Sequence, residues 1–259
     1  MSSQPKRDDR LTVAAIAIVA FVIADVAHEV LGHGVGFFLA GGRSGIFTTT
    51  RLIETQRLGE RGGAIFDLGG PFGNLLFAAL PWLAQRLLRR PAPRLRLLLW
   101  LVMTFSLYWA FGYLAFCGVV ARADWFALIK GLPHLWLWRV LFIAAGLALY
   151  RASMQLAASE LRWLGHPRSG LGRLVFTSYL AAGCIGCAGC ILDPRGAWEI
   201  LNSGALTTFA AMIGLLQVPR LSTAFGDTDI DRSDAWIVSA TVIAAFYIGM
   251  LGPGIRFAL

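Results

Sequence analysis

The chain has 259 residues, of which 57% are hydrophobic and 15% are charged, and its formal net charge at neutral pH is +8. Soluble domains carry about 25% charged residues, so this composition excludes an ordinary soluble domain and indicates a membrane protein. The basic residues lie between apolar runs, where positive charge orients membrane helices, so we expect no nucleic-acid partner.

Hydropathy predicts six or seven apolar segments, each close to the roughly twenty residues that a helix needs to cross a bilayer. The predicted fold class is therefore all-α, a polytopic bundle of transmembrane helices. A short polar tail, MSSQPKRDDR, precedes the first segment, which we interpret as a retained helix. We expect one membrane domain, with a three-span core in 1–134 and additional helices in 135–259. The predicted spans are 11–40, 63–88, 96–120, 135–158, 173–192, 197–219 and 235–256.

The first predicted span contains the sequence VAHEVLGHGVGF, which places ionisable side chains in an otherwise apolar helix. An ionisable group inside a membrane costs several kcal/mol unless it is paired or serves a function, so four such groups in nine residues indicate a site. Two histidines next to a glutamate are typical of zinc hydrolases, in which the glutamate is the general base. Here the histidines are five positions apart, one more than in that motif. The four residues are Asp25, His28, Glu29 and His33.

The extra residue in this motif has a geometric consequence. On a regular helix His28 and His33 would lie about 140° apart around the axis, which is poor for sharing one ion. We expect a single-turn π-bulge, which Gly32 makes inexpensive and which leaves Glu29 free as a base. In the alternative, the helix is regular and Asp25, Glu29 and His33 line one face as the ligand set.

The segments after the first span carry two further patterns. Residues 41–62 have Gly at both ends and β-branched residues within, which predicts a short hairpin at the membrane surface. The next span contains GGPFGN. This sequence indicates either a helix break that lines a polar cavity beside Asn74, or close helix packing through Gly69, Gly70 and Gly73.

Zinc bound by two histidines needs a third protein ligand. Asp124, at the end of the third span, is the first choice, and His134, in an interfacial turn, is the alternative. His166 is expected to be a loop residue. Asp67 is a further buried acid that could orient a histidine.

The second half of the chain contains cysteines and an acidic loop. Thiolates at C-x-x-C spacing can bind metal or be redox active, but inside a span of small residues we expect close packing and no disulfides. The acidic loop at 220–234 resembles a calcium loop, yet Arg232 stands where Gly is needed and Val238 where a bidentate Glu is needed. We expect a solvated loop. The cysteines in the repeat GCIGCAGC are Cys184, Cys187 and Cys190.

The sequence AHEVLGHG, the GGPFGN of the next span and an aspartate after the third span together resemble the site-2-protease family of intramembrane zinc metalloproteases. The resemblance covers residues 20–130. This chain departs from the family pattern in the extra residue of the helix motif and in Trp125, which follows Asp124 where the family has Gly. The resemblance implies zinc as cofactor, His28, His33 and Asp124 as metal ligands, Glu29 as catalytic base and Asn74 as a substrate-binding residue.

The resemblance also implies an activity, namely that of an endopeptidase that hydrolyses peptide bonds of membrane-associated protein or peptide substrates. The alternative is a catalytically inactive, metalloprotease-like membrane protein that acts in binding, assembly or transport, and the altered motif favours it. We expect a multi-pass integral protein of a bacterial cytoplasmic membrane. The distribution of Lys and Arg favours a cytoplasmic N-terminus, whereas the family usually runs the motif helix in the opposite direction.

Overall fold

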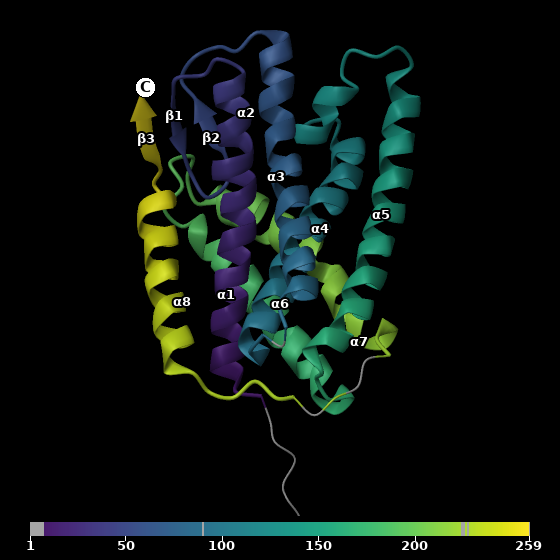
Figure 1. Cartoon of the computed structure of the whole chain (residues 1–259). Helices are drawn as coiled ribbons and strands as arrows, with labels where there is room; N and C mark the ends of the chain where they lie inside the picture. The colour runs from purple at the N-terminus through teal and green to yellow at the C-terminus, as the bar shows by residue number, and fades with distance from the viewer. Residues whose placement is uncertain (1–7, 90, 224–225, 227, 259) are drawn as a thin grey trace, which may run out of the picture.

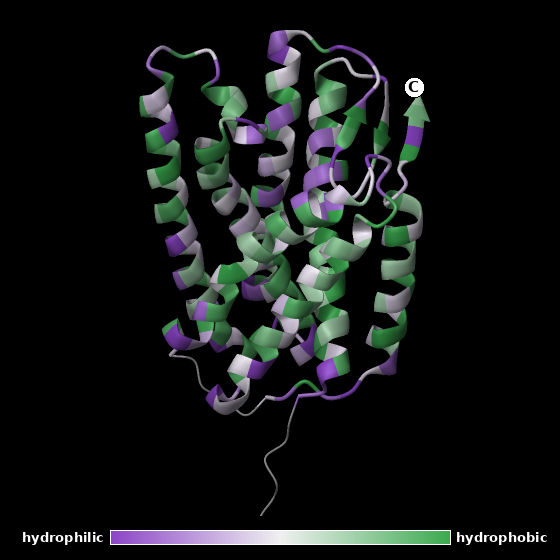
Figure 2. Cartoon of the chain, turned by 180° about the vertical axis from the view of Figure 1, so that it is seen from behind, coloured by the Kyte–Doolittle hydropathy of each residue, from purple (hydrophilic) through white to green (hydrophobic). Residues whose placement is uncertain are grey.

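The chain folds into a bundle of long apolar helices, seen in a computed structural model that describes residues 8–89, 91–223, 226 and 228–258. Within these ranges, seven helices are long and apolar enough to cross a membrane, and they pack side by side (Figure 1). Hydrophobic residues cover the middle of the bundle, and hydrophilic residues gather toward its two ends (Figure 2). The protein is therefore an all-α integral membrane protein, as its composition predicted. Most of the predicted polar tail lies outside the described residues.

All seven predicted spans are confirmed, with ends that shift by a few residues. The first span, Arg10–Leu39, is one continuous helix with a π-helical turn inside it. Its parts are α1 (Arg10–Val26), η1 (Ala27–Gly32) and α2 (His33–Leu39). The other spans contain α3 (Glu60–Leu87), α4 (Pro93–Val120), α5 (Leu135–Leu164), α6 (Arg168–Gly189), η3 (Ile200–Ala210) with η4 (Ile213–Gln217) and α7 (Val218–Leu221), and α8 (Asp234–Phe246) with η5 (Tyr247–Leu251).

The α1 helix forms the centre of the bundle, where it packs against α4, α6 and α8. It is apolar on nearly every face, as expected of a helix that is buried rather than amphipathic. The helix begins at a capping residue, because the Asp9 carboxylate accepts a hydrogen bond of 2.9 Å from the backbone N–H of Thr12. The span continues from α1 into η1 and α2, and the ionisable side chains of the motif are buried inside the bundle.

The α3 helix lies against the π-helical turn through glycines. It runs unbroken through GGPFGN, so the predicted helix break is wrong and the alternative, close packing, is confirmed. A Cβ on Gly32 would lie 2.5 Å from the carbonyl oxygen of Gly69, and a Cβ on Gly73 would overlap the carbonyl oxygen of Ala27. The two backbones can touch only because these positions lack side chains.

The predicted hairpin is confirmed and belongs to a small sheet. Strands β1 (Ser44–Phe47) and β2 (Leu52–Glu54) pair antiparallel, and β3 (Ile255–Ala258) pairs antiparallel with the other edge of β1. The strand order is β2-β1-β3, and β3, from the opposite end of the chain, was not predicted. The sheet lies at the end of the bundle remote from the start of α1 (Figure 1).

The remaining predictions for the second half of the chain are partly confirmed. All four cysteines are free, and α6 and η3 are in close contact, where a Cβ on Gly204 would lie 2.8 Å from the Cα of Cys187. In the acidic loop Asp231 and Arg232 are exposed, as expected. His166 lies in the loop between α5 and α6 but is buried, and its Nε2 lies 2.8 Å from the Asp8 carboxylate.

Candidate metal centre

The two histidines of the motif converge because the helix widens between them. The backbone N–H of His33 donates to the carbonyl oxygen of His28, an i→i−5 bond that defines the π-helical turn η1. The two imidazole centroids are 4.9 Å apart, with the ring planes at 88° to each other. The predicted π-bulge is confirmed, and the regular-helix alternative is wrong.

A third candidate ligand joins the histidines from outside the first span. Asp124 opens a short 3-10 helix, η2 (Asp124–Leu128), that follows α4. Its Oδ2 lies 3.1 Å from Nε2 of His28 and 3.4 Å from Nε2 of His33. One ligand atom from each of the three residues falls within 4.8 Å of the others. The structure therefore brings together the three residues that the sequence resemblance implied.

The backbone that delivers Asp124 adopts unfavourable conformations. Ala121, which ends α4, is left-handed with φ 54°, and Ala123 has φ 73° and ψ −176°. The second conformation belongs to a region that is essentially restricted to glycine, and such strain costs about 1–3 kcal/mol. Strained residues cluster at functional sites, where the surrounding structure holds them. The chain thus stores strain directly before the carboxylate of the site.

Each imidazole is oriented through its second nitrogen. The Nδ1–H of His33 donates to the carbonyl oxygen of Phe66 at 2.9 Å, which directs Nε2 of the same ring at Asp124. We expected Asp67 to orient a histidine, but the acceptor is the backbone carbonyl of the preceding residue. A backbone acceptor needs no polar side chain, so no sequence pattern marks it.

His28 is oriented by Asn74. The Asn74 side chain is fully buried, and its amide lies 3.0 Å from Nδ1 of His28, while its Oδ1 has no hydrogen-bond partner in the described part of the chain. Turning the amide by 180° exchanges its oxygen and nitrogen, so that Oδ1 accepts a hydrogen bond from Nδ1–H of His28. The other ring nitrogen, Nε2, then has a lone pair available for a metal. We expected Asn74 to contact substrate, and the structure gives it a contact with a candidate ligand.

The residues present fit a zinc ion. Tetrahedral zinc with bonds of about 2.0–2.1 Å places its ligand atoms about 3.3 Å apart, close to the two separations measured from Asp124. Oδ2 of Asp124 is buried without a hydrogen-bond partner among the described residues, although two imidazole nitrogens face it. Burial acts to raise the pKa of this carboxyl group, but the neighbouring His33 and His28 hold it below its ordinary value. An ionised oxygen between two imidazoles is a donor set typical of catalytic zinc.

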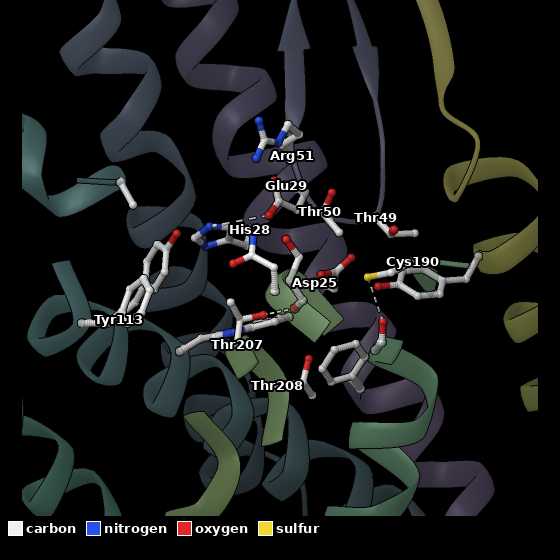
Figure 3. A pocket seen from close by; sticks show the side chains of 18 of the residues that line it. Asp25, His28, Glu29, Thr49, Thr50, Arg51, Tyr113, Cys190, Thr207 and Thr208 are labelled. Atoms are coloured by element: carbon white, nitrogen blue, oxygen red, sulfur yellow. Dashed lines mark hydrogen bonds and ion pairs between the residues drawn. The ribbon is translucent and has the colours of Figure 1, made fainter. Parts of the chain in front are cut away.

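Glu29 lies beside these donors without joining them. Its Oε1 is 4.0 Å from Nε2 of His28, and its Oε2 is buried with no hydrogen-bond partner among the described residues. The carboxylate faces a cavity of about 320 Å³, which Asp25 and His28 also line (Figure 3). A buried carboxylate with a free oxygen next to a metal centre can accept and donate a proton.

Other residues also line the site; of these, Asp25 was expected from the sequence, whereas Tyr247, Tyr113 and Arg51 were not. Asp25 lies one turn before Glu29 and lines the same cavity as Tyr247 of the last span. Tyr113 contacts the ring of His28, with centroids 6.1 Å apart, and Arg51 reaches the cavity from the hairpin loop. These contacts join segments far apart in the sequence, and no local pattern announces them. The alternative ligand, His134, is exposed at the start of α5 and does not join the group formed by His28, His33 and Asp124.

No protein-family model, curated protein or solved structure matches this chain. The function is therefore inferred from the site itself.

Proposed function

We propose that this chain is an intramembrane zinc metalloprotease that hydrolyses peptide bonds of membrane-associated polypeptides. The observation that carries the proposal is the convergence of His28, His33 and Asp124 on one point, with the unpartnered Oε2 of Glu29 beside it. A bound zinc ion would polarise the scissile carbonyl and lower the pKa of a bound water toward neutrality.

The chain's own residues supply the remaining chemistry. His28, His33 and Asp124 would hold the ion, while the carbonyl of Phe66 and the amide of Asn74 fix the two imidazoles. Three protein ligands are the number found at catalytic zinc sites. Each imidazole is held at Nδ1, and its Nε2 lies close to Oδ2 of Asp124.

Glu29 acts as the general base and then as the general acid. Its free oxygen accepts the proton of the attacking water and delivers that proton to the departing amine nitrogen. The role needs a carboxylate that is close to the metal but not consumed by another partner. Glu29 meets that requirement, because its Oε2 has no hydrogen-bond partner among the described residues.

The membrane location supports a membrane-associated substrate. The cavity beside Glu29 is lined by residues of α1, α4, α6 and η3, which all belong to spans, together with the hairpin loop. A polypeptide that reaches Glu29 therefore has to enter between transmembrane helices or from beneath the hairpin.

Activity against a model transmembrane peptide tests this proposal. Purified protein in detergent is expected to cut the peptide, to lose this activity with a chelator, and to regain it when zinc is restored. The Glu29→Gln variant is expected to cut nothing under the same conditions. Cleavage that persists in Glu29→Gln, or in the metal-free chain, would contradict the proposal.

A further inference from the structure

The cavity beside Glu29 contains positive charge that the proposed reaction does not use. Two arginines line it: Arg51, from the loop between β1 and β2, and Arg122, from the turn between α4 and η2. In the part of the chain that the structure describes, neither guanidinium has a hydrogen bond or an ion pair. An arginine presents five donors in a planar fork that matches a carboxylate.

The loop that carries Arg51 is fixed at several points. Oγ1 of Thr48 donates to the carbonyl oxygen of Arg51, and Oγ1 of Thr49 donates to the carbonyl oxygen of Gly189 at the end of α6, both at 2.9 Å. Oγ1 of Thr50 donates to Asp193 at 2.9 Å. The Arg51 side chain extends from this loop over Glu29 and His28 (Figure 3). A backbone held by three side chains thus presents an unpaired guanidinium to the site.

Arg122 is also held in place by its backbone. It lies between Ala121 and Ala123, whose φ angles of 54° and 73° are unfavourable for alanine. The strained turn that delivers Asp124 to the histidines therefore places Arg122 along the same cavity. Local strain of this kind is retained where a functional geometry requires it.

Both guanidinium groups line the cavity that Asp25 and Glu29 also line. A divalent cation held by His28, His33 and Asp124 would add further positive charge beside it. This charge favours an anionic group of a ligand in the cavity, and a carboxylate matches the planar fork of each arginine.

We propose that this cavity binds a carboxylate of the substrate, an acidic side chain or chain terminus close to the scissile bond, through Arg51 and Arg122. This proposal rests on the proposed function, because that function places the scissile bond beside the candidate metal ligands and Glu29. It makes the two arginines specificity-determining residues of the site. The protease would accordingly favour membrane-associated polypeptides with an acidic residue beside the bond that is cut.

The test uses two short leucine-rich peptide hydroxamates that differ only in a glutamate or a glutamine next to the hydroxamate. Their dissociation constants are measured on the full chain in phosphatidylcholine nanodiscs, zinc-loaded and after chelation. The glutamate probe is expected to bind the zinc-loaded chain at least about tenfold more tightly, the scale of one charge-assisted hydrogen bond. The measured quantity is the ratio of the two dissociation constants, glutamine probe over glutamate probe. Arg51→Gln and Arg122→Gln should each bring this ratio close to one, and Arg51→Lys should retain part of the preference.

The matched control is Arg43→Gln, because Arg43 is an exposed arginine of the same hairpin segment that does not line the cavity. It should leave the ratio unchanged, and bound zinc should be equal in all variants. A ratio near one in both forms of the wild-type chain, or a ratio that both glutamine variants retain, would overturn the proposal.

Zinc content and lipid composition provide two further arms of the experiment. If the chain binds no zinc, the proposed function fails. The ratio of the two dissociation constants on the metal-free chain still shows whether the cavity prefers the glutamate probe. A ratio that disappears in phosphatidylglycerol nanodiscs would assign the arginines to a lipid headgroup and overturn the assignment to a peptide carboxylate.

Discussion

The backbone N–H of His33 donates to the carbonyl oxygen of His28, five residues before it, and this bond sets the geometry of the whole site. It absorbs the additional residue of the motif and turns both imidazoles toward Asp124. A π-helical turn costs little at Gly32, whose missing side chain also lets α3 approach. The longer motif therefore gives the convergence that a shorter motif gives on a regular helix.

The contact between α3 and the imidazoles predicts the effect of Gly70→Ala. A Cβ at this position would lie 2.5 Å from Nε2 of His33 and 2.7 Å from Nε2 of His28, so the substitution should displace the ligand atoms and lower zinc affinity by about tenfold or more. Zinc titration of the purified variant measures the effect. The control is Gly63→Ala in the same helix, where a Cβ meets nothing within 4 Å. Equal zinc affinity in the two variants would contradict the packing described.

The orienting role of Asn74 predicts the effect of Asn74→Ala. Removing the amide frees Nδ1 of His28, and loss of such an outer-shell partner typically costs 10–100-fold in metal affinity. Zinc binding, followed by competition with a chromophoric chelator, measures the change. A residue that only contacts substrate would leave zinc affinity unaltered, so an unchanged affinity would restore the substrate-binding role expected from the sequence.

The strained backbone at Ala123 predicts a stabilising substitution. Glycine adopts the observed φ and ψ without steric cost, so Ala123→Gly should raise the free energy of unfolding by about 1–3 kcal/mol. The change is measured as the thermal midpoint in detergent. Ala148→Gly, at an exposed position of α5, should act in the opposite direction by up to about 1 kcal/mol. A lower midpoint for Ala123→Gly than for wild type would show that the position is not strained.

The hydrogen bond from Thr50 of the hairpin loop to Asp193 predicts that the attachment of the hairpin depends on pH. Burial acts to raise the pKa of Asp193, but hydrogen bonds from Arg195 and Thr50 outweigh it and lower that pKa below 3.8. A carboxyl group with a lowered folded pKa stabilises the structure above its unfolded pKa, and this contribution is lost as the pH falls. The hairpin should therefore be held at neutral pH and loosen below pH 3.8.

Asp193→Asn should loosen the hairpin already at neutral pH. We expect about tenfold faster limited proteolysis within residues 44–57, the scale of one lost charge-assisted hydrogen bond. The control is Asp234→Asn, which removes an exposed ion pair with Arg232 and should change nothing measurable. Equal proteolysis of both variants would contradict the anchoring role.

The sequence predicted the fold and most of the candidate site because many of the relevant signals are local. Apolar segments of about twenty residues report spans directly, and Asp25, His28, Glu29 and His33 stand out in the first of them. The spacing of the histidines, with Gly32 between them, favoured the π-helical turn over a regular helix. The hairpin likewise followed from its flanking glycines and β-branched residues.

The remaining parts of the site depend on contacts between distant segments. The carbonyl of Phe66 orients His33 without any polar side chain, and one cavity is lined both by Asp25 of the first span and by Tyr247 of the last. Strand β3 pairs with β1 although about two hundred residues separate them. The helix break predicted at GGPFGN was wrong because the glycines allow close packing against η1 rather than an opening.

The most direct test of the central claim is bound zinc measured together with peptide cleavage in wild type, Glu29→Gln and Asp124→Ala. Replacing a base with an isosteric amide leaves the ligand shell intact, whereas removing a ligand lowers affinity for the ion. We predict about one zinc per chain and cleavage in wild type, full zinc without cleavage in Glu29→Gln, and reduced zinc in Asp124→Ala. Zinc that is lost in Glu29→Gln but kept in Asp124→Ala, or no zinc in well-folded wild type, would contradict the account.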